Sequence, residues 1–284
     1  MSKKLRIIIA CCVIASLISL CGFAFEKISR RETQMNETIS FLQSEVDNLW
    51  AKVRIIEDEN TRLRLELSAL NKQPAKAYSS DSFNYLAIGN SILIHETNAH
   101  WWNEIGMAAS SADKDYFHIV VNYLETVYGD IDCYAFCLPS WEIQYYDRSE
   151  CLQLLDAYLN PELDLVTVQL GDNVNDGLET YETDLIELLE YIKKSSPKAQ
   201  IIVVGDFFEV EGRDALKISA VEQCNADYAD ISSIRNDPEY LCGMGTTVYD
   251  AEGNPHEIDY MGIAMHPGDK GMLYIADAII KCIK

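Results

Sequence analysis

The chain begins with a long apolar stretch. The residues between Arg6 and Glu26 carry no charge. As a helix these 19 residues measure about 28 Å, which is enough to cross the hydrocarbon core of a bilayer. We therefore expect residues 1–26 to form a cytoplasmic tail and a transmembrane signal-anchor, with the rest of the chain outside the cytoplasm. Cleavage after Gly22-Phe23-Ala24, a small-x-small site, is the alternative, and it predicts a secreted protein.

A repeat of apolar residues at alternating spacings of three and four follows this stretch. Its members are Ile39, Leu42, Val46, Leu49, Val53, Ile56, Leu63, Leu67 and Leu70. Mostly β-branched residues at one core position and mostly Leu at the other favour two parallel strands. Asn60, the one polar residue in the seam, can pair with its own copy in such a dimer. Residues 27–71 are thus predicted to be a parallel dimeric coiled-coil stalk. The alternative is a single amphipathic helix packed on its own domain.

Beyond the repeat, short apolar runs alternate with segments of helix length. Residues 72–82 contain Pro, Ser and Ala and are predicted to be a linker. The strand-length runs are 85–88, 131–137, 165–170, 201–204 and 228–231. The helix-length segments are 116–127, 150–159, 181–194, 215–224 and 271–283. Such alternation predicts a three-layer α/β/α domain with a five-stranded parallel sheet and right-handed crossovers over residues 83–284.

Composition narrows the choice of partners. The chain is 48% hydrophobic, as a globular protein is, and its formal net charge is -22. That charge repels phosphate backbones and anionic lipid surfaces, so nucleic acid is not expected as a partner. The six cysteines beyond residue 130 lack the spacing of a zinc site and are expected to be mostly free thiols.

The unusual residues of the domain follow the predicted strands. Ser91 lies on a Gly-Asn turn after the first strand, Asn173 follows the third, and His266 precedes the last helix. The carboxyl ends of parallel strands share one edge of the sheet, where sites form. A serine hydroxyl presented there is activated when a histidine lies beside it. The alternatives are a capping turn for Ser91, a local turn for Asn173 and a helix-entry loop for His266.

Three short blocks resemble the SGNH or GDSL hydrolases, which are flavodoxin-like α/β esterases. LAIGNSI resembles the first block of that family, LGDNV the third and AMHPGDKGM the fifth. The resemblance implies that Ser91 is the nucleophile, Asn173 an oxyanion-hole donor and His266 the general base. It covers roughly residues 83–284, and its weight comes from the joint occurrence of the three blocks in order.

The second block departs from the family pattern. The family has an oxyanion-hole amide there, usually at a glycine, but this chain reads LPSWE after its second strand. Pro139 has no amide hydrogen. The backbone amide of Ser140 or Leu138 is therefore expected to donate instead.

The usual acid is also missing. Ile263 stands three residues before His266, where the family has Asp. A hydrophobic side chain cannot orient an imidazole. We therefore expect a Ser-His dyad with a backbone carbonyl on the imidazole, and the alternative is that Asp259 serves as the orienting acid.

These features predict a membrane-anchored, extracytoplasmic serine esterase that removes acyl groups, most simply acetyl, from a surface or extracellular glycan. An O-acyltransferase using the same residues, or an inactive glycan-binding scaffold, are the alternatives. An aromatic wall for sugars, or ordinary core packing, is the expectation for Trp101, Trp102, Trp141, Tyr145 and Tyr146. The expected partners are the acylated glycan, the membrane and a second copy of the chain. No cofactor or metal is expected, since His256 and Asp259 lack ligand spacing.

Overall fold

A computed structural model describes residues 76–284 and, before them, residues 31, 33, 35, 36, 38–46, 48, 49, 52, 53, 56 and 63. The chain divides into two units, residues 1–56 and 57–284. The predicted tail and signal-anchor lie outside the described residues. Within the part of the chain that is described, no helix has the length and apolar character needed to span a bilayer.

The described residues of the first unit are helical, and their apolar side chains are exposed. Ile39, Leu42, Val46 and Leu49 are between 46% and 57% accessible. An apolar helical stripe of this kind is the feature that a coiled coil buries against a second strand. Asn60 lies outside the described residues, and the dimer remains a prediction.

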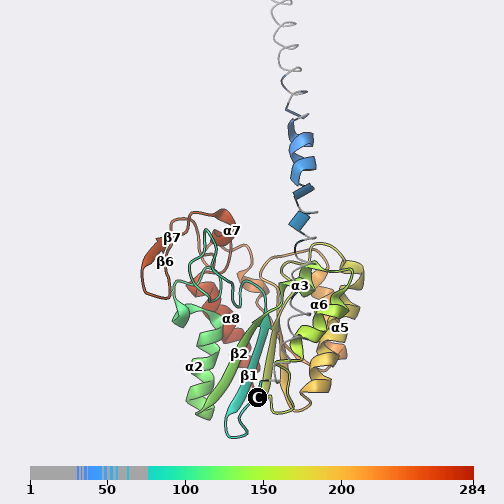
Figure 1. Cartoon of the computed structure of the whole chain (residues 1–284), viewed down its shortest axis with the longest axis vertical. Helices are drawn as coiled ribbons and strands as arrows, with labels where there is room; N and C mark the ends of the chain where they lie inside the picture. Colours follow the sequence, from blue (N-terminus) through green and yellow to red (C-terminus); the bar gives the residue numbers. More distant parts are fainter. Residues whose placement is uncertain are drawn as a thin grey trace, which may run out of the picture. The chain divides into compact units, whose positions relative to one another are not determined.

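The second unit is built on five parallel strands, as predicted (Figure 1). They are β1 (Phe83–Gly89), β2 (Ile131–Cys137), β3 (Leu165–Gln169), β4 (Gln200–Val204) and β5 (Asp227–Ala229). Their order in the sheet is β2-β1-β3-β4-β5. This is the doubly wound, flavodoxin-like order, in which the chain reverses direction across the sheet between β1 and β3.

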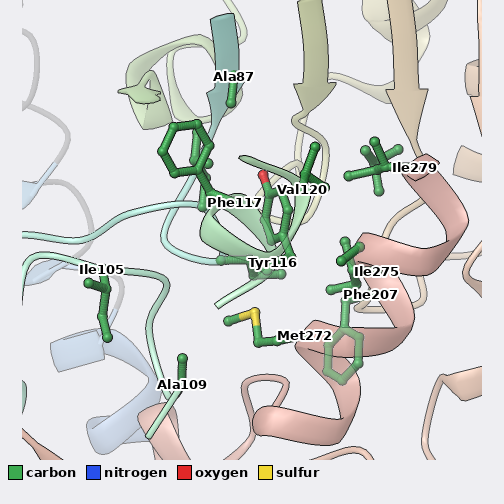
Figure 2. Packing of buried hydrophobic residues seen from close by; sticks show 14 of the residues in the cluster. Ala87, Ile105, Ala109, Tyr116, Phe117, Val120, Phe207, Met272, Ile275 and Ile279 are labelled. Carbon is green, nitrogen blue, oxygen red and sulfur yellow. The ribbon is translucent and has the colours of Figure 1, made fainter. Parts of the chain in front are cut away.

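Helices cover both faces of the sheet (Figure 1). One face packs against α2 (Tyr116–Tyr128) and α8 (Asp269–Cys282), and the other against α5 (Leu178–Ser195) and α6 (Arg213–Gln223). Side chains of β1 alternate between the two cores, with Ala87 in the first and Leu86 in the second. Figure 2 shows Ala87 in the same packing as Tyr116 of α2 and Met272 of α8. The three-layer expectation is confirmed by this arrangement.

Shorter elements complete the domain. They are η1 (Ala112–Lys114), α3 (Pro139–Ile143), α4 (Arg148–Cys151), η2 (Leu152–Leu155), η3 (Ser232–Ile234), α7 (Met261–Ala264) and an antiparallel hairpin of β6 (Thr247–Tyr249) and β7 (Pro255–Glu257). The segment 150–159, expected to be one helix, is instead split between α4 and η2. The amide of Asp156 bonds to the carbonyl of Gln153, three residues back, which is the tighter 3-10 pattern.

The predicted linker is not free of the domain over its described part. Tyr78 is buried in the core beside α5 and α6, and the Lys76 amide donates to the Ala157 carbonyl at 2.7 Å. The ammonium of Lys76 also lies 2.9 Å from Asp132. Residues 76–82 therefore belong to the folded domain. The six cysteines of the domain carry free thiols in this structure.

Candidate active site

The turn after β1 presents Ser91. The amides of Leu93 and Ile94 both donate to the Asn90 carbonyl at 3.1 Å, and the Ile92 amide donates to Asn90 Oδ1 at 3.0 Å. A Cβ at Gly89 would lie 2.7 Å from Leu93 Cβ, so the chain folds back too closely for any other residue. Glycine at this position thus allows the turn that places the Ser91 hydroxyl at the strand end.

Ser91 and His266 meet, although 175 positions separate them in the chain. Ser91 Oγ lies 3.0 Å from His266 Nε2. On the far side of the ring, Nδ1 lies 2.8 Å from the Gly262 carbonyl oxygen. A carbonyl oxygen only accepts, so Nδ1 carries the proton and Nε2 presents its lone pair to the hydroxyl. The structure therefore holds the histidine in the tautomer that a general base requires.

The surroundings of His266 favour its neutral form. Burial lowers the pKa of His266 to about 4, the hydrogen bond to the Gly262 carbonyl opposes that shift, and His95 adds to it. The ring of Phe208 stands edge-on to the imidazole with centroids 5.5 Å apart. At neutral pH the ring is uncharged and able to accept a proton.

No carboxylate orients this imidazole in the described structure. Ile263, at the family's acid position, is buried in the core between the sheet and α8. Asp259 lies 2.9 Å from Nδ1 of His100, and its side chain is 63% exposed. This corrects the alternative in which Asp259 orients His266. The backbone carbonyl of Gly262 occupies the place that an acid has in a triad.

Asn173 lines the same pocket as Ser91, and its Nδ2 donates to Oε2 of Glu142 at 2.7 Å. Of the two amides considered after β2, that of Leu138 already donates to the Gly89 carbonyl at 2.7 Å. The Ser140 amide lies in the first turn of α3, where no helical carbonyl precedes it. Of the two, the Ser140 amide therefore remains the candidate for the oxyanion hole.

Glu142 is the member of the site that sequence reasoning missed. Its side chain is 1% exposed, and it also accepts from Asn90 Nδ2 at 2.9 Å, Gly171 N at 2.5 Å and Asn173 N at 3.3 Å. Burial raises the pKa of Glu142, and the hydrogen bonds oppose that shift. The LPSWE segment shows an acid after β2, but glutamate is rarely buried, so the sequence carries no signal of this role.

A pocket of about 600 Å³ opens beside Ser91 along β2. Tyr158 stacks on Tyr134 at 4.7 Å and lies 4.5 Å from the Phe136 ring, and all three line the pocket. Glu96 and Glu104 line it too, and none of its lining residues in the described part of the chain is Lys or Arg. The pocket is thus aromatic on one side and acidic on another.

The prediction of an aromatic wall named the wrong residues. Trp101 and Trp141 are completely buried, and Trp102 stacks on His256 at 4.5 Å. Neither Tyr145 nor Tyr146 lines the pocket. Core packing accounts for the two buried tryptophans, while β2 and the segment after η2 supply the aromatic side chains of the pocket.

Comparisons with known proteins return solved structures only. No protein-family model and no curated protein matches the chain. A phospholipase A1 from Streptomyces albidoflavus is 13% identical, with 71% of this chain and 99% of that chain covered and a TM-score of 0.48. An acetyl xylan esterase from Geobacillus stearothermophilus is 18% identical, with 72% and 97% covered and a TM-score of 0.43. A GDSL-like lipase from Bacteroides uniformis is 11% identical, with 70% and 94% covered and a TM-score of 0.46.

These neighbours are named as a phospholipase, an acetyl xylan esterase and a GDSL-like lipase. Identities this low leave the reaction open. The chemistry of the site therefore rests on the chain's own residues.

Proposed function

We propose that the chain is a serine esterase that works with a Ser-His dyad. The observation that carries this is the line of contacts from Ser91 Oγ through His266 to the Gly262 carbonyl. It aligns a nucleophile, a neutral base and a group that accepts the Nδ1 hydrogen when the ring becomes charged. A turn serine or a helix-entry histidine requires none of these contacts.

In the proposed reaction, Ser91 Oγ bonds to the acyl carbon while its proton passes to His266 Nε2. The carbonyl electrons move onto oxygen, where the amides of Ser91 and Ser140 and the Asn173 side chain donate hydrogen bonds. The bond to the alcohol then breaks, and the imidazolium protonates the leaving oxygen. Water, deprotonated by His266, attacks the acyl-serine, which releases the carboxylic acid and restores the hydroxyl of Ser91.

The substrate that we propose is an acylated, most simply acetylated, uncharged glycan outside the cytoplasm. Aromatic faces such as those of Tyr134 and Tyr158 suit the apolar face of a sugar ring. Glu96 and Glu104 repel phosphate and other anionic groups. Mass spectrometry of an O-acetylated neutral oligosaccharide tests this. Loss of the acetyl group to water supports the esterase, and its appearance on an added acceptor glycan indicates an acyltransferase instead.

We further propose that the N-terminal helix anchors the chain and that the stalk pairs two copies. The exposed stripe that includes Ile39, Leu42 and Val46 supports the pairing, and the uncharged stretch between Arg6 and Glu26 is the basis for the anchor. We expect a protein of residues 27–284 to sediment at the mass of a dimer and one of residues 76–284 at the mass of a monomer. A monomeric 27–284 protein at micromolar concentration would contradict the proposed stalk.

The pH dependence of kcat/KM tests the base. Since burial holds the pKa of His266 near 4, the imidazole is neutral above that pH, and activity is lost only as the pH falls through about 4. We expect a flat profile between pH 5.5 and pH 7.5, both of which lie about 1.5 units or more above that pKa. If a Glu142→Gln variant shows the same pH profile, the loss of activity at low pH comes from His266 and not from Glu142. A limb near the ordinary histidine value of about 6.5 would contradict the assignment.

A further inference from the structure

The carboxylate of Glu142 connects two turns that end neighbouring strands. Asn90, beside Ser91, reaches it from the turn after β1, and Gly171 and Asn173 reach it from the turn after β3. Glu142 itself lies on α3, directly after β2. The carboxylate therefore joins the strand ends β2, β1 and β3, which are adjacent in the sheet.

Every contact with this carboxylate is a donated N–H. The two oxygens of Glu142 accept these bonds, whereas an asparagine amide offers NH₂ on one side and oxygen on the other. At 1% exposure Glu142 has no access to bulk water that would satisfy a reversed amide. Glu142 therefore favours the orientation in which Nδ2, rather than Oδ1, of Asn173 faces it.

The two oxygens of the carboxylate accept hydrogen bonds from different donors. Oε1 accepts from Asn90 Nδ2, Gly171 N and Asn173 N, while Oε2 accepts only from Asn173 Nδ2. A glutamine at this position keeps three donors satisfied when its oxygen takes the Oε1 side. Its NH₂ group then faces the Asn173 NH₂ group, and two donors cannot bond to each other.

We propose that Glu142 is a positioning residue that fixes the Asn173 amide so that its second Nδ2 hydrogen is available to the oxyanion. The inference rests on the proposed esterase function and adds a role that no motif of the chain indicates. Glu142 does not touch substrate, and it acts through Asn173. Its removal therefore lowers transition-state stabilisation while leaving substrate binding little changed.

The test uses Glu142→Gln in the protein of residues 1–284, extracted in detergent and assayed on a small acetyl ester. Asn173 must turn its amide to offer Oδ1 to the new NH₂ group, which moves Nδ2 from its present position. We expect kcat to fall about 10²-fold, the loss typical of one oxyanion-hole donor, with KM changed less than about threefold. The matched control is Glu150→Gln, an exposed acid on α4, which should retain the parent's kcat.

A double-variant cycle shows whether the effect passes through Asn173. In an Asn173→Ala background, Glu142→Gln should change kcat less than about threefold, because the group it positions is already absent. A further 10²-fold loss there, or parental kcat in the single variant, overturns the inference. Either result leaves the esterase proposal standing, whereas a parent no more active than Ser91→Ala removes the esterase proposal itself.

If Glu142→Gln does not fold, a second variant that exchanges the acid and the amide between positions 142 and 173 provides the test. Combining Glu142→Gln with Asn173→Asp restores a hydrogen bond, now donated by the glutamine to the new carboxylate. We expect this protein to melt near the parent's temperature and to have lost at least 10²-fold in kcat, since residue 173 no longer donates. Parental kcat in a folded exchange variant overturns the inference.

Discussion

Ser91→Ala is expected to lower kcat/KM for a small acetyl ester by on the order of 10⁴-fold or more. The alanine removes the only atom that bonds to the acyl carbon in the proposed reaction, and His266 then has no hydroxyl to deprotonate. The residue precedes Ile92 in a turn held by backbone contacts and by Asn90, so the fold should be unaffected. Initial rates and a thermal melt, measured on the same preparation, check both expectations.

The control for this experiment is Ser232→Ala, at an exposed serine in η3 that does not line the pocket. It should retain the parent's rate. A fluorophosphonate probe should add its mass to the parent and to Ser232→Ala, but not to Ser91→Ala. Equal rates in the parent and in Ser91→Ala would end the serine-esterase proposal.

His266→Ala should give a loss of similar size, because in the proposed reaction His266 and Ser91 act as one unit. Residues of this kind are strongly non-additive, so the double variant should be no slower than either single one by more than about threefold. A clearly larger loss in the double variant would indicate that Ser91 is activated by something other than His266.

The fold and the approach of Ser91 to His266 could be predicted from the sequence because both depend on local patterns. Apolar runs of strand length marked the sheet, and the Gly-Asn-Ser turn and the histidine lay at positions where parallel strands converge. Ser91 and His266 are 175 positions apart in the chain, and the topology of the sheet brings them together. The alternation of strands and helices already predicted that topology.

Other parts of the site could not be predicted from the sequence, because side chains of similar type occupy different places in the fold. Nothing in the local sequence distinguishes Trp141, which is buried, from Tyr134, which lines the pocket. The side-chain hydrogen bonds of Glu142 come from donors that lie 29 to 52 positions away in the chain. Contacts of that kind are set by how loops pack, and hydrophobic periodicity does not encode them.

Asp206 is a second buried carboxylate close to the site. It follows β4 and pairs with Arg213 through Nε at 2.6 Å and with the Lys217 ammonium, all three side chains being at most 1% exposed. Arg213 also donates to the Val174 carbonyl at 2.9 Å and to that of Phe208, so the pair ties together the loops after β3 and β4. A Cβ at Gly171 would collide with Asp206, which shows how closely this group approaches the Asn173 turn.

Asp206→Asn is therefore expected to reduce the free energy of unfolding by about 3–5 kcal/mol, the cost of leaving a buried charge without its partner. Asp172, whose pKa is raised by burial and then by Asp206, would lose that repulsion and ionise more readily. Ionisation of Asp172 would offset only part of the lost stability, because its carboxylate already accepts hydrogen bonds from the amides of Phe207 and Phe208 at 2.8 Å.

Urea unfolding followed by circular dichroism measures this change, with Glu162→Gln as the control. Glu162 pairs with Lys198 at 3.3 Å, and both side chains are about half exposed, so its loss should cost less than about 1 kcal/mol. A loss below about 1 kcal/mol for Asp206→Asn would mean that desolvation of the three charges cancels their attraction. The loops after β3 and β4 would then be positioned by backbone contacts, and an unchanged kcat in Asp206→Asn would accompany that result. The larger loss, by contrast, should come with lower activity even below the unfolding transition, since Asn173 and Phe208 stand on those two loops.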